Sequence, residues 1–180
     1  MIHDVYGEKE DAMFQNLYPK EECDSAYTLD YEQLYEKGYR GIIFDIDNTL
    51  VEHGAPANDK AIALVDKLRR MGFSVCFLSN NDEPRVSEFC KPMDTAYIYK
   101  AGKPKRKGYE AAMKLIDTTK EQTISIGDQI FTDMWGANRA GIHTILVKPI
   151  GKKEEIQIVL KRYLEKIVLY FYRKNKKKVQ

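Results

Sequence analysis

Residues 41–50 read GIIFDIDNTL, and this stretch decides the fold. Residues 41–44 form an uninterrupted apolar run, which is typical of a parallel strand covered on both faces. Asp45, Asp47 and Thr49 follow directly. Alternation along a strand would turn both carboxylates the same way, and carboxylates this close repel each other unless a cation or a shared proton offsets their charge. A buried strand that ends in paired acids therefore predicts a functional site.

The rest of the chain alternates between strand and helix patterns. Asn58 is a favourable N-cap, and Gly72 is a favourable stop for the helix between them. Strand and helix in regular alternation predict an α/β fold with a doubly wound, Rossmann-like parallel sheet, which binds ligands beyond the carboxyl ends of its strands. We expect further strands at residues 73–78, 97–99, 123–126 and 143–147, and helices at 31–37, 58–71, 85–91, 107–116 and 132–140.

Composition indicates one folded domain in a reducing compartment. The 180 residues are 43% hydrophobic, and no apolar run approaches the roughly 18 residues of a membrane-spanning helix. The first residues lack the apolar core of a signal peptide. Cys23, Cys76 and Cys90 are odd in number and far apart, which is typical of free thiols and does not indicate zinc. We therefore expect a cytoplasmic protein.

Polar groups follow four of the expected strands or the loops beyond them. In this order they match the four motifs of the haloacid dehalogenase (HAD) phosphatases across about residues 41–148, and DIDNTLV at 45–51 resembles the first signature of that family. The resemblance implies one HAD core without a cap domain, preceded by a lead-in at 1–40 and followed by an extension at 149–180. The polar groups are Asp45, Asp47 and Thr49, then Ser79, then Lys103, and finally Asp128 with Asp133.

The resemblance also implies a mechanism. Asp45 would attack phosphorus and form an aspartyl-phosphate, which divides one difficult step into two. Asp47 would protonate the leaving oxygen and then activate the hydrolytic water. An aspartate two positions after the nucleophile favours a phosphatase over family members with other chemistry.

Binding of the phosphoryl group would fall to the later motifs. Ser79 and the backbone N–H of Asn80 would donate hydrogen bonds to phosphoryl oxygens, and Thr49 would brace the loop. Lys103 would place a positive charge beside the phosphoryl group. Lys100 and Lys105 are nearby rivals for that role, but Gly102-Lys103-Pro104 resembles the third motif.

The implied cofactor is Mg²⁺, which prefers oxygen ligands and is typically held by one or two carboxylates together with substrate phosphate. By resemblance, Asp45, the backbone carbonyl of Asp47 and Asp128 would be the ligands. Asp133 would either orient a metal-bound water or brace Lys103.

The spacing of the motifs leaves no room for a cap. Only 34 residues separate Asp45 from Ser79, and 24 separate Ser79 from Lys103. An open site suits a substrate too large to be enclosed, such as a protein, a nucleic acid end or a lipid at a membrane surface. Closure of the site by oligomerisation is the alternative.

Residues 151–180 have their own electrostatic character. Ten lysines or arginines against three glutamates give this segment a net charge of +7, while the remaining 150 residues carry −5. An apolar stripe of Ile156, Leu160, Tyr163 with Leu164, Ile167 and Phe171 predicts an amphipathic helix. Two readings stay open: peripheral contact with an anionic membrane, at its inner face, or a stripe that docks on the sheet.

Nearly the full chain resembles the YqeG-type HAD phosphatases, which are capless and similar to mitochondrial phosphatidylglycerophosphate phosphatases. Leu164-Glu165-Lys166-Ile167-Val168, the lead-in and the short gaps carry this resemblance. It implies an anionic lipid monoester as substrate, with a soluble phosphomonoester or a phosphoprotein as the alternative. A receiver-like phospho-acceptor domain is the alternative from another class, and Asp47 argues against it. The acidic remainder of the chain argues against nucleic acid as a partner.

Overall fold

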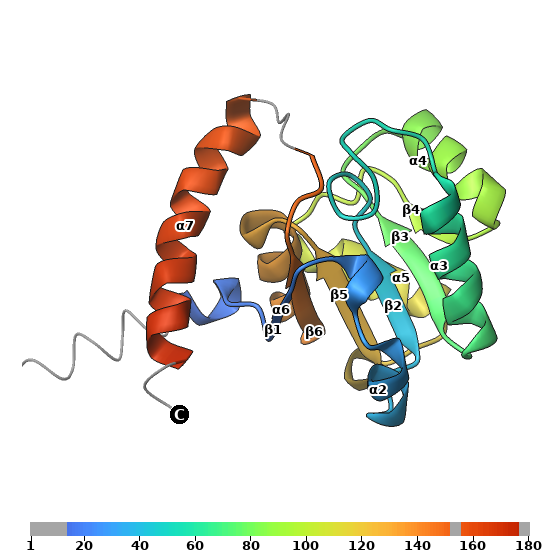
Figure 1. Cartoon of the computed structure of the whole chain (residues 1–180), viewed down its shortest axis with the longest axis horizontal. Helices are drawn as coiled ribbons and strands as arrows, with labels where there is room; N and C mark the ends of the chain where they lie inside the picture. The colour runs from blue at the N-terminus through green and yellow to red at the C-terminus, as the bar shows by residue number, and fades with distance from the viewer. Residues whose placement is uncertain (1–13, 152–155, 177–180) are drawn as a thin grey trace, which may run out of the picture.

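The computed structural model describes residues 14–151 and 156–176, with the side chains of 156–162, 175 and 176 excepted. Its centre is a six-stranded, all-parallel sheet in the order β1-β6-β5-β2-β3-β4 (Figure 1). The predicted doubly wound α/β fold is confirmed. The strands are β1 (Glu21–Cys23), β2 (Gly41–Phe44), β3 (Ser74–Leu78), β4 (Ala96–Ile98), β5 (Thr123–Gly127) and β6 (His143–Val147).

The helices begin and end close to the predicted bounds. Asn58 caps α3 as expected, because its Oδ1 accepts a hydrogen bond from the Ala61 N–H at 2.9 Å. The helices are α2 (Tyr31–Glu36), α3 (Asp59–Arg70), α4 (Glu83–Cys90), α5 (Arg106–Leu115), α6 (Trp135–Arg139) and α7 (Ile156–Lys176). Short 3₁₀ segments are η1 (Gln15–Leu17), η2 (Ala26–Thr28), η3 (Lys91–Met93) and η4 (Lys120–Gln122), and η5 (Ile130–Met134) is a π-helix.

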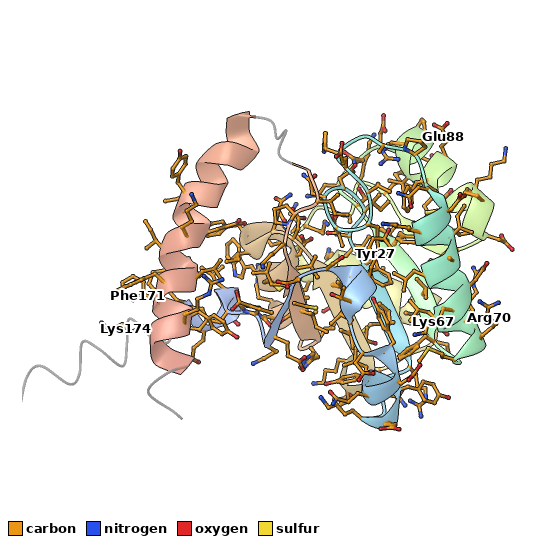
Figure 2. All side chains as sticks on the ribbon, in the orientation of Figure 1. Tyr27, Lys67, Arg70, Glu88, Phe171 and Lys174 are labelled. Carbon is orange, nitrogen blue, oxygen red and sulfur yellow. The ribbon has the colours of Figure 1, made fainter. Side chains whose placement is uncertain are left out.

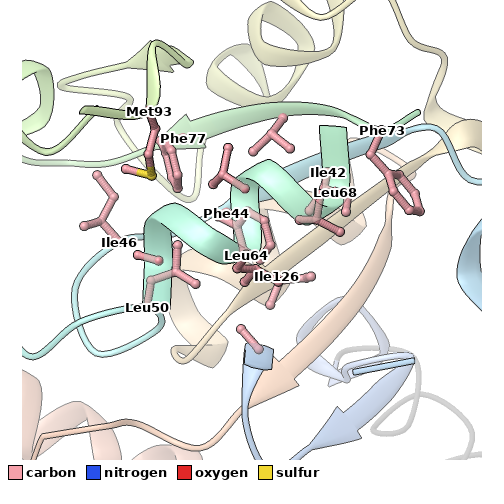
Figure 3. Packing of buried hydrophobic residues seen from close by; sticks show 14 of the residues in the cluster. Ile42, Phe44, Ile46, Leu50, Leu64, Leu68, Phe73, Phe77, Met93 and Ile126 are labelled. Atoms are coloured by element: carbon pink, nitrogen blue, oxygen red, sulfur yellow. The ribbon is translucent and has the colours of Figure 1, made fainter. Parts of the chain in front are cut away.

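Strand alternation divides the core between the two faces of the sheet. Ile42 and Phe44 of β2 pack with Leu68 of α3 in the larger cluster, which Figure 3 shows between the strands and that helix. Ile43 points to the other face and packs in a second cluster with Tyr109 of α5 and Ala137 of α6. Helices on both faces explain why β2 and residues 75–78 of β3 are apolar without alternation.

Only short elements separate the motifs. Between Asp45 and Lys103, a stretch that the structure describes throughout, the helices and strands are α3, β3, α4, η3 and β4. No cap domain is inserted in this stretch, so no such domain covers the carboxyl ends of the strands.

Two features of the lead-in and of η5 differ from expectation. Residues 21–23 belong to the lead-in, where no strand was expected, but they form the edge strand β1, which pairs with β6. Its sequence, Glu21-Glu22-Cys23, contains no apolar run that would have indicated a strand. The side chain of Glu21 contacts His143, that of Glu22 contacts Arg173, and Cys23 packs against the larger core cluster. The helix predicted at 132–140 begins earlier, as the π-helix η5, and becomes α-helical at Trp135.

Helix α7 lies beside the β1–β6 edge of the sheet (Figure 1), but it docks through a stripe other than the predicted one. Val168 and Tyr172 are buried on its inner side. Among the described members of the predicted stripe, the exposed fractions are 62% for Tyr163, 51% for Leu164, 54% for Ile167 and 41% for Phe171. Ile156 and Leu160 of that stripe lie outside the described side chains. None of the described helices combines the length and apolar character needed to cross a bilayer.

Candidate active site

The site is built around a buried lysine that joins two loops to the end of β2. Lys103 Nζ lies 2.5 Å from Asp45 Oδ1 and 2.7 Å from Asp133 Oδ1. The Lys103 side chain is only 5% exposed, whereas Lys100 and Lys105 are exposed residues. Of the three rival lysines, the structure therefore brings Lys103 into the cluster. Asp133 braces it, which is one of the two roles expected for that residue.

Burial and charge act against each other in this cluster. Burial raises the pKa of the Asp45 carboxyl to about 6, although the Lys103 ammonium lowers it. Burial also opposes the charged form of Lys103, but Asp133 and Asp45 outweigh it and hold the Lys103 pKa well above its ordinary value. Lys103 is therefore a fixed positive charge. A divalent cation beside Asp45 would favour the ionised carboxylate further.

Three carboxylates converge at the carboxyl ends of β2 and β5. One oxygen each from Asp45, Asp128 and Asp133 can be chosen so that all lie within 4.8 Å of one another. The hydroxyl of Thr49 lies 3.2 Å from Asp45 Oδ2 and 3.4 Å from Asp128 Oδ1, and it donates to these carboxylates. Such a donor set fits a divalent cation that prefers oxygen ligands. The Asp47 carboxylate is not in this group.

The glycine at the end of β5, Gly127, is needed because the Asp133 side chain packs directly against it. A Cβ at Gly127 would lie 2.5 Å from Asp133 Cγ, so a larger residue would displace the carboxylate. Asp133 Oδ2 accepts a hydrogen bond from the Gln129 N–H at 3.1 Å. The turn of the chain through η5 thus places Asp133 beside Lys103, which is 30 residues away in sequence.

Ser79 and Asn80 lie at the end of β3, on the other side of β2 from β5. Ser79 is buried, and its Oγ accepts a hydrogen bond from the Asn81 N–H at 3.1 Å. The Asn80 side chain holds the Lys103 backbone, because its Oδ1 accepts from the Lys103 N–H at 2.8 Å. The side chain of Asn80 therefore positions the lysine loop, while the role predicted for Asn80 concerned its backbone N–H.

Asp47 has a separate set of partners. The Gly54 N–H donates to its Oδ1 at 2.7 Å, and Asn81 Nδ2 donates to its Oδ2 at 2.6 Å. Arg85 donates from one nitrogen to Asp47 Oδ1 at 3.0 Å and to the Ala55 carbonyl at 2.8 Å. The predicted strand alternation does not reach Asp47, because β2 ends at Phe44 and the chain turns back on itself with a bridge from Asp47 to Val51.

Sequence reasoning missed Arg85 and Asn81. Both follow Ser79 within the segment 79–85, but an arginine in the first turns of an amphipathic helix is usually solvated. Arg85 reaches the site only because the loop 47–55 folds against α4. Its place beside Asp47 could not be inferred from spacing along the chain.

Comparisons with known proteins agree with this geometry. A model of the HAD-hydrolase-like family matches residues 100–159. Over 152 residues the chain is 38% identical to the probable phosphatase YqeG of Bacillus subtilis, covering 84% of this chain and 88% of that protein. The chain therefore belongs to the HAD-like hydrolases and is a phosphatase, a phosphoric monoester hydrolase. Within that family it is YqeG-like.

More distant relatives extend the comparison. The chain is 28% identical to phosphatidylglycerophosphate phosphatase 1 of Arabidopsis thaliana over 164 residues, which cover 77% of this chain and 45% of that protein. The cobalt-bound deoxy-D-mannose-octulosonate 8-phosphate phosphatase of Haemophilus influenzae superposes with a TM-score of 0.51 and 17% identity, over 62% of this chain and 69% of that one. At this identity, the likeness shows the fold alone.

The carboxylate group predicts metal-linked stability. At a Mg²⁺ concentration of about 100 times its dissociation constant, binding to the folded state alone raises the free energy of unfolding by about 2.7 kcal/mol. For a domain of this size, this corresponds to a rise of about 5–10 °C in the unfolding temperature. Asp128→Asn should remove most of this shift, because it removes a charged ligand. Differential scanning fluorimetry with and without Mg²⁺ measures it.

Asp66→Asn, on the exposed side of α3, is the matched control and should keep the shift. A full Mg²⁺ shift in Asp128→Asn would place the cation outside this carboxylate group.

Proposed function

We propose that this phosphatase is Mg²⁺-dependent and hydrolyses phosphomonoesters through an aspartyl-phosphate on Asp45. The observation that carries the proposal is the position of Asp45, whose carboxylate lies at the end of β2 against Lys103 and within the carboxylate group of Asp128 and Asp133. A phosphate ester resists attack because its oxygens repel a nucleophile, so neutralisation and positioning do most of the catalytic work. This cluster supplies both.

The steps follow from the partners of each side chain. Asp45 attacks phosphorus, and the bond from phosphorus to the ester oxygen breaks while Asp47 gives that oxygen a proton. Asp47 then takes a proton from water, whose oxygen attacks phosphorus and releases Asp45 and inorganic phosphate. Lys103 and Ser79 bind phosphoryl oxygens throughout, and Thr49 keeps Asp45 and Asp128 in place. Held by Asp45, Asp128 and the Asp47 carbonyl, Mg²⁺ would supply charge neutralisation at the phosphoryl group.

Turnover of a generic aryl phosphate tests the two aspartates. Asp45→Asn should abolish turnover, because an amide is a poor nucleophile, and Asp47→Asn should lower it by about 10²–10⁴-fold, the usual contribution of a general acid–base. Chelation with EDTA should abolish activity, and added Mg²⁺ should restore it. Wild-type turnover by Asp45→Asn would show that the nucleophile is another group.

A receiver-like domain would respond differently to the same experiment. It would accept phosphate from acetyl phosphate and hold it, with no steady turnover. Asp47 argues for hydrolysis, since it places an acid–base group two residues from the nucleophile. Stable phosphorylation without turnover would favour the receiver alternative.

The contacts of Asp47 predict a dependence on the leaving group. Arg85 fixes the carboxylate of Asp47 and ties the loop 47–55 to α4. Arg85→Met should therefore reduce kcat/KM about ten- to a hundredfold more for an alkyl phosphate than for nitrophenyl phosphate, because only the alkoxide must be protonated as it leaves. Asp47→Asn should show the same selectivity.

The controls separate this role of Arg85 from general damage to the fold. Arg85→Lys keeps the charge and should lose less than Arg85→Met. Arg70→Met removes an exposed arginine at the end of α3 (Figure 2) and should match the wild type on both substrates. Equal losses on the two substrates in Arg85→Met would contradict a link to leaving-group protonation.

For the substrate we propose an anionic lipid monoester, with phosphatidylglycerophosphate as the leading candidate. Support comes from the absence of a cap between Asp45 and Lys103 and from the name of the Arabidopsis relative. Another soluble phosphomonoester or a phosphoprotein is the alternative, because an open site admits these as well. The lipid substrate would require the enzyme to meet a membrane surface.

The outward face of α7 fits such a surface. Large apolar side chains, Leu164, Ile167 and Tyr170 among them, are exposed there, and Lys174 lies beside Phe171 on the side turned away from the sheet (Figure 2). Apolar side chains flanked by basic ones, in a segment of net charge +7, are typical of helices that lie on anionic membranes. We propose a peripheral position at the inner face of the membrane, reached from the cytoplasm.

Co-sedimentation with anionic vesicles tests this face. The double change Leu164→Gln and Ile167→Gln should weaken binding about tenfold or more, because each leucine or isoleucine contributes a kcal/mol or so when partly buried in lipid. Binding of the wild type should also fall as salt rises. Leu115→Gln, equally exposed but on α5, is the matched control. Equal sedimentation of the variant and the wild type would exclude this face from membrane contact.

A further inference from the structure

A cleft of about 590 Å³ separates the β1–β6 edge of the sheet from helix α7. Asp128, a member of the carboxylate group, lines this α7 cleft, which therefore adjoins the candidate active site at this residue. On the opposite side its wall is α7, through Lys166, Leu169 and Arg173. Its size is that of an ordinary ligand pocket.

Most of the α7 cleft is apolar. Two of its three lining cations are paired with acids within the chain: Lys148 Nζ lies 2.5 Å from Asp24 Oδ1, and an Arg173 nitrogen lies 2.8 Å from Glu22 Oε1. The third cation, Lys166, lies over the Tyr163 ring at 5.0 Å. Four acidic residues also line the cleft, which is therefore poorly suited to a second anionic group: Glu22, Asp24, Asp128 and Glu165. It suits an uncharged, apolar group. Its apolar lining is Ile130, Leu146, Val147, Pro149 and Leu169.

The described part of the N-terminal segment packs against α7 without lining this cleft. The Phe14 ring stacks on Phe171 at 6.4 Å between centroids, and Tyr18 meets Tyr172 at 5.5 Å. These four aromatic residues are absent from the cleft lining. Their packing holds α7 at its C-terminal half and leaves the cleft beside Asp128 open.

We propose that the α7 cleft binds an alkyl chain on the alcohol part of the substrate, so that the preferred substrates are monoesters of chain-bearing alcohols. The proposal rests on the phosphatase function proposed above and adds the class of leaving group. With its phosphoryl group at Asp45 and Lys103, the substrate would extend past Asp128 into the apolar lining of the cleft. Each methylene buried there should tighten binding by up to about fourfold.

A series of n-alkyl phosphates, used below the concentration at which they form micelles, tests this without any membrane. For the wild type, kcat/KM should rise about two- to fourfold per methylene from methyl to octyl phosphate. Leu169→Gln places an amide on the apolar wall and should reduce this slope by at least half. Leu115→Gln, on the exposed side of α5, should keep the slope of the wild type.

A second measurement needs neither a variant nor turnover. Titration calorimetry of the wild type with methyl- and octylphosphonate in the presence of Mg²⁺ should show tighter binding of the longer chain by at least tenfold. Equal affinities, or an alkyl phosphate series with no slope, would overturn the cleft assignment. Hydrolysis of methyl phosphate would then still support the proposed function. If the enzyme hydrolysed none of the alkyl phosphates but still bound the longer phosphonate more tightly, the proposed function would be overturned. The assignment of the cleft as an alkyl-chain site would then stand.

The alternative to an alkyl chain in the α7 cleft is a second copy of this chain. Sedimentation velocity distinguishes it: a dimer that Leu169→Gln converts to monomer would show that the cleft is a subunit contact and would overturn the alkyl-chain proposal. A wild-type monomer with a chain-length slope supports it.

Discussion

The ion pairs of Lys103 are the constraint on which the rest of the site depends. A buried ammonium costs several kcal/mol in lost hydration unless acids compensate it, and Asp45 and Asp133 do so at 2.5 and 2.7 Å. The same contacts offset the repulsion between the two carboxylates. Since the three residues come from loops after β2, β4 and β5, the pairing fixes the relative positions of three strand ends. Loss of the lysine would leave crowded carboxylates with no compensating charge inside the protein.

Backbone hydrogen bonds hold these loops before any ligand arrives. The Ala101 N–H donates to the Ser79 carbonyl at 3.0 Å, and the Lys103 N–H donates to Asn80 Oδ1 at 2.8 Å. Asp133 is held in turn by the Gln129 N–H. The charged groups therefore need little rearrangement to meet a phosphoryl group, and preorganised charge of this kind is the main catalytic resource for phosphoryl transfer.

Much of the fold was predictable, because buried parallel strands leave unbroken apolar runs such as residues 41–44 and 75–78. The motif positions were predictable because each follows an expected strand or the loop beyond it. Strand β1 was not predictable, because it is only three residues long and is stabilised by its pairing with β6. Arg85 was not, because its contact with Asp47 exists only after the loop 47–55 has folded against α4. Pattern along the chain reports burial, whereas these contacts depend on tertiary structure.

Helix α7 shows why an apolar stripe does not by itself decide which face is buried. Glu165 lies on the docked face, only 5% exposed, and its Oε1 accepts a hydrogen bond from the Ile130 N–H at 2.8 Å. That N–H belongs to the first turn of η5, where a backbone donor has no partner within the helix. The fold would lose stability if this buried donor or this buried carboxylate had no hydrogen-bond partner, so their pairing favours the docking of the face that also buries Val168 and Tyr172. The more apolar stripe, with Leu164 and Ile167, is consequently left outside. Glu165, which holds α7, is thus hydrogen-bonded to Ile130, two residues after Asp128. This bond connects the helix to the loop that carries the Asp128 carboxylate.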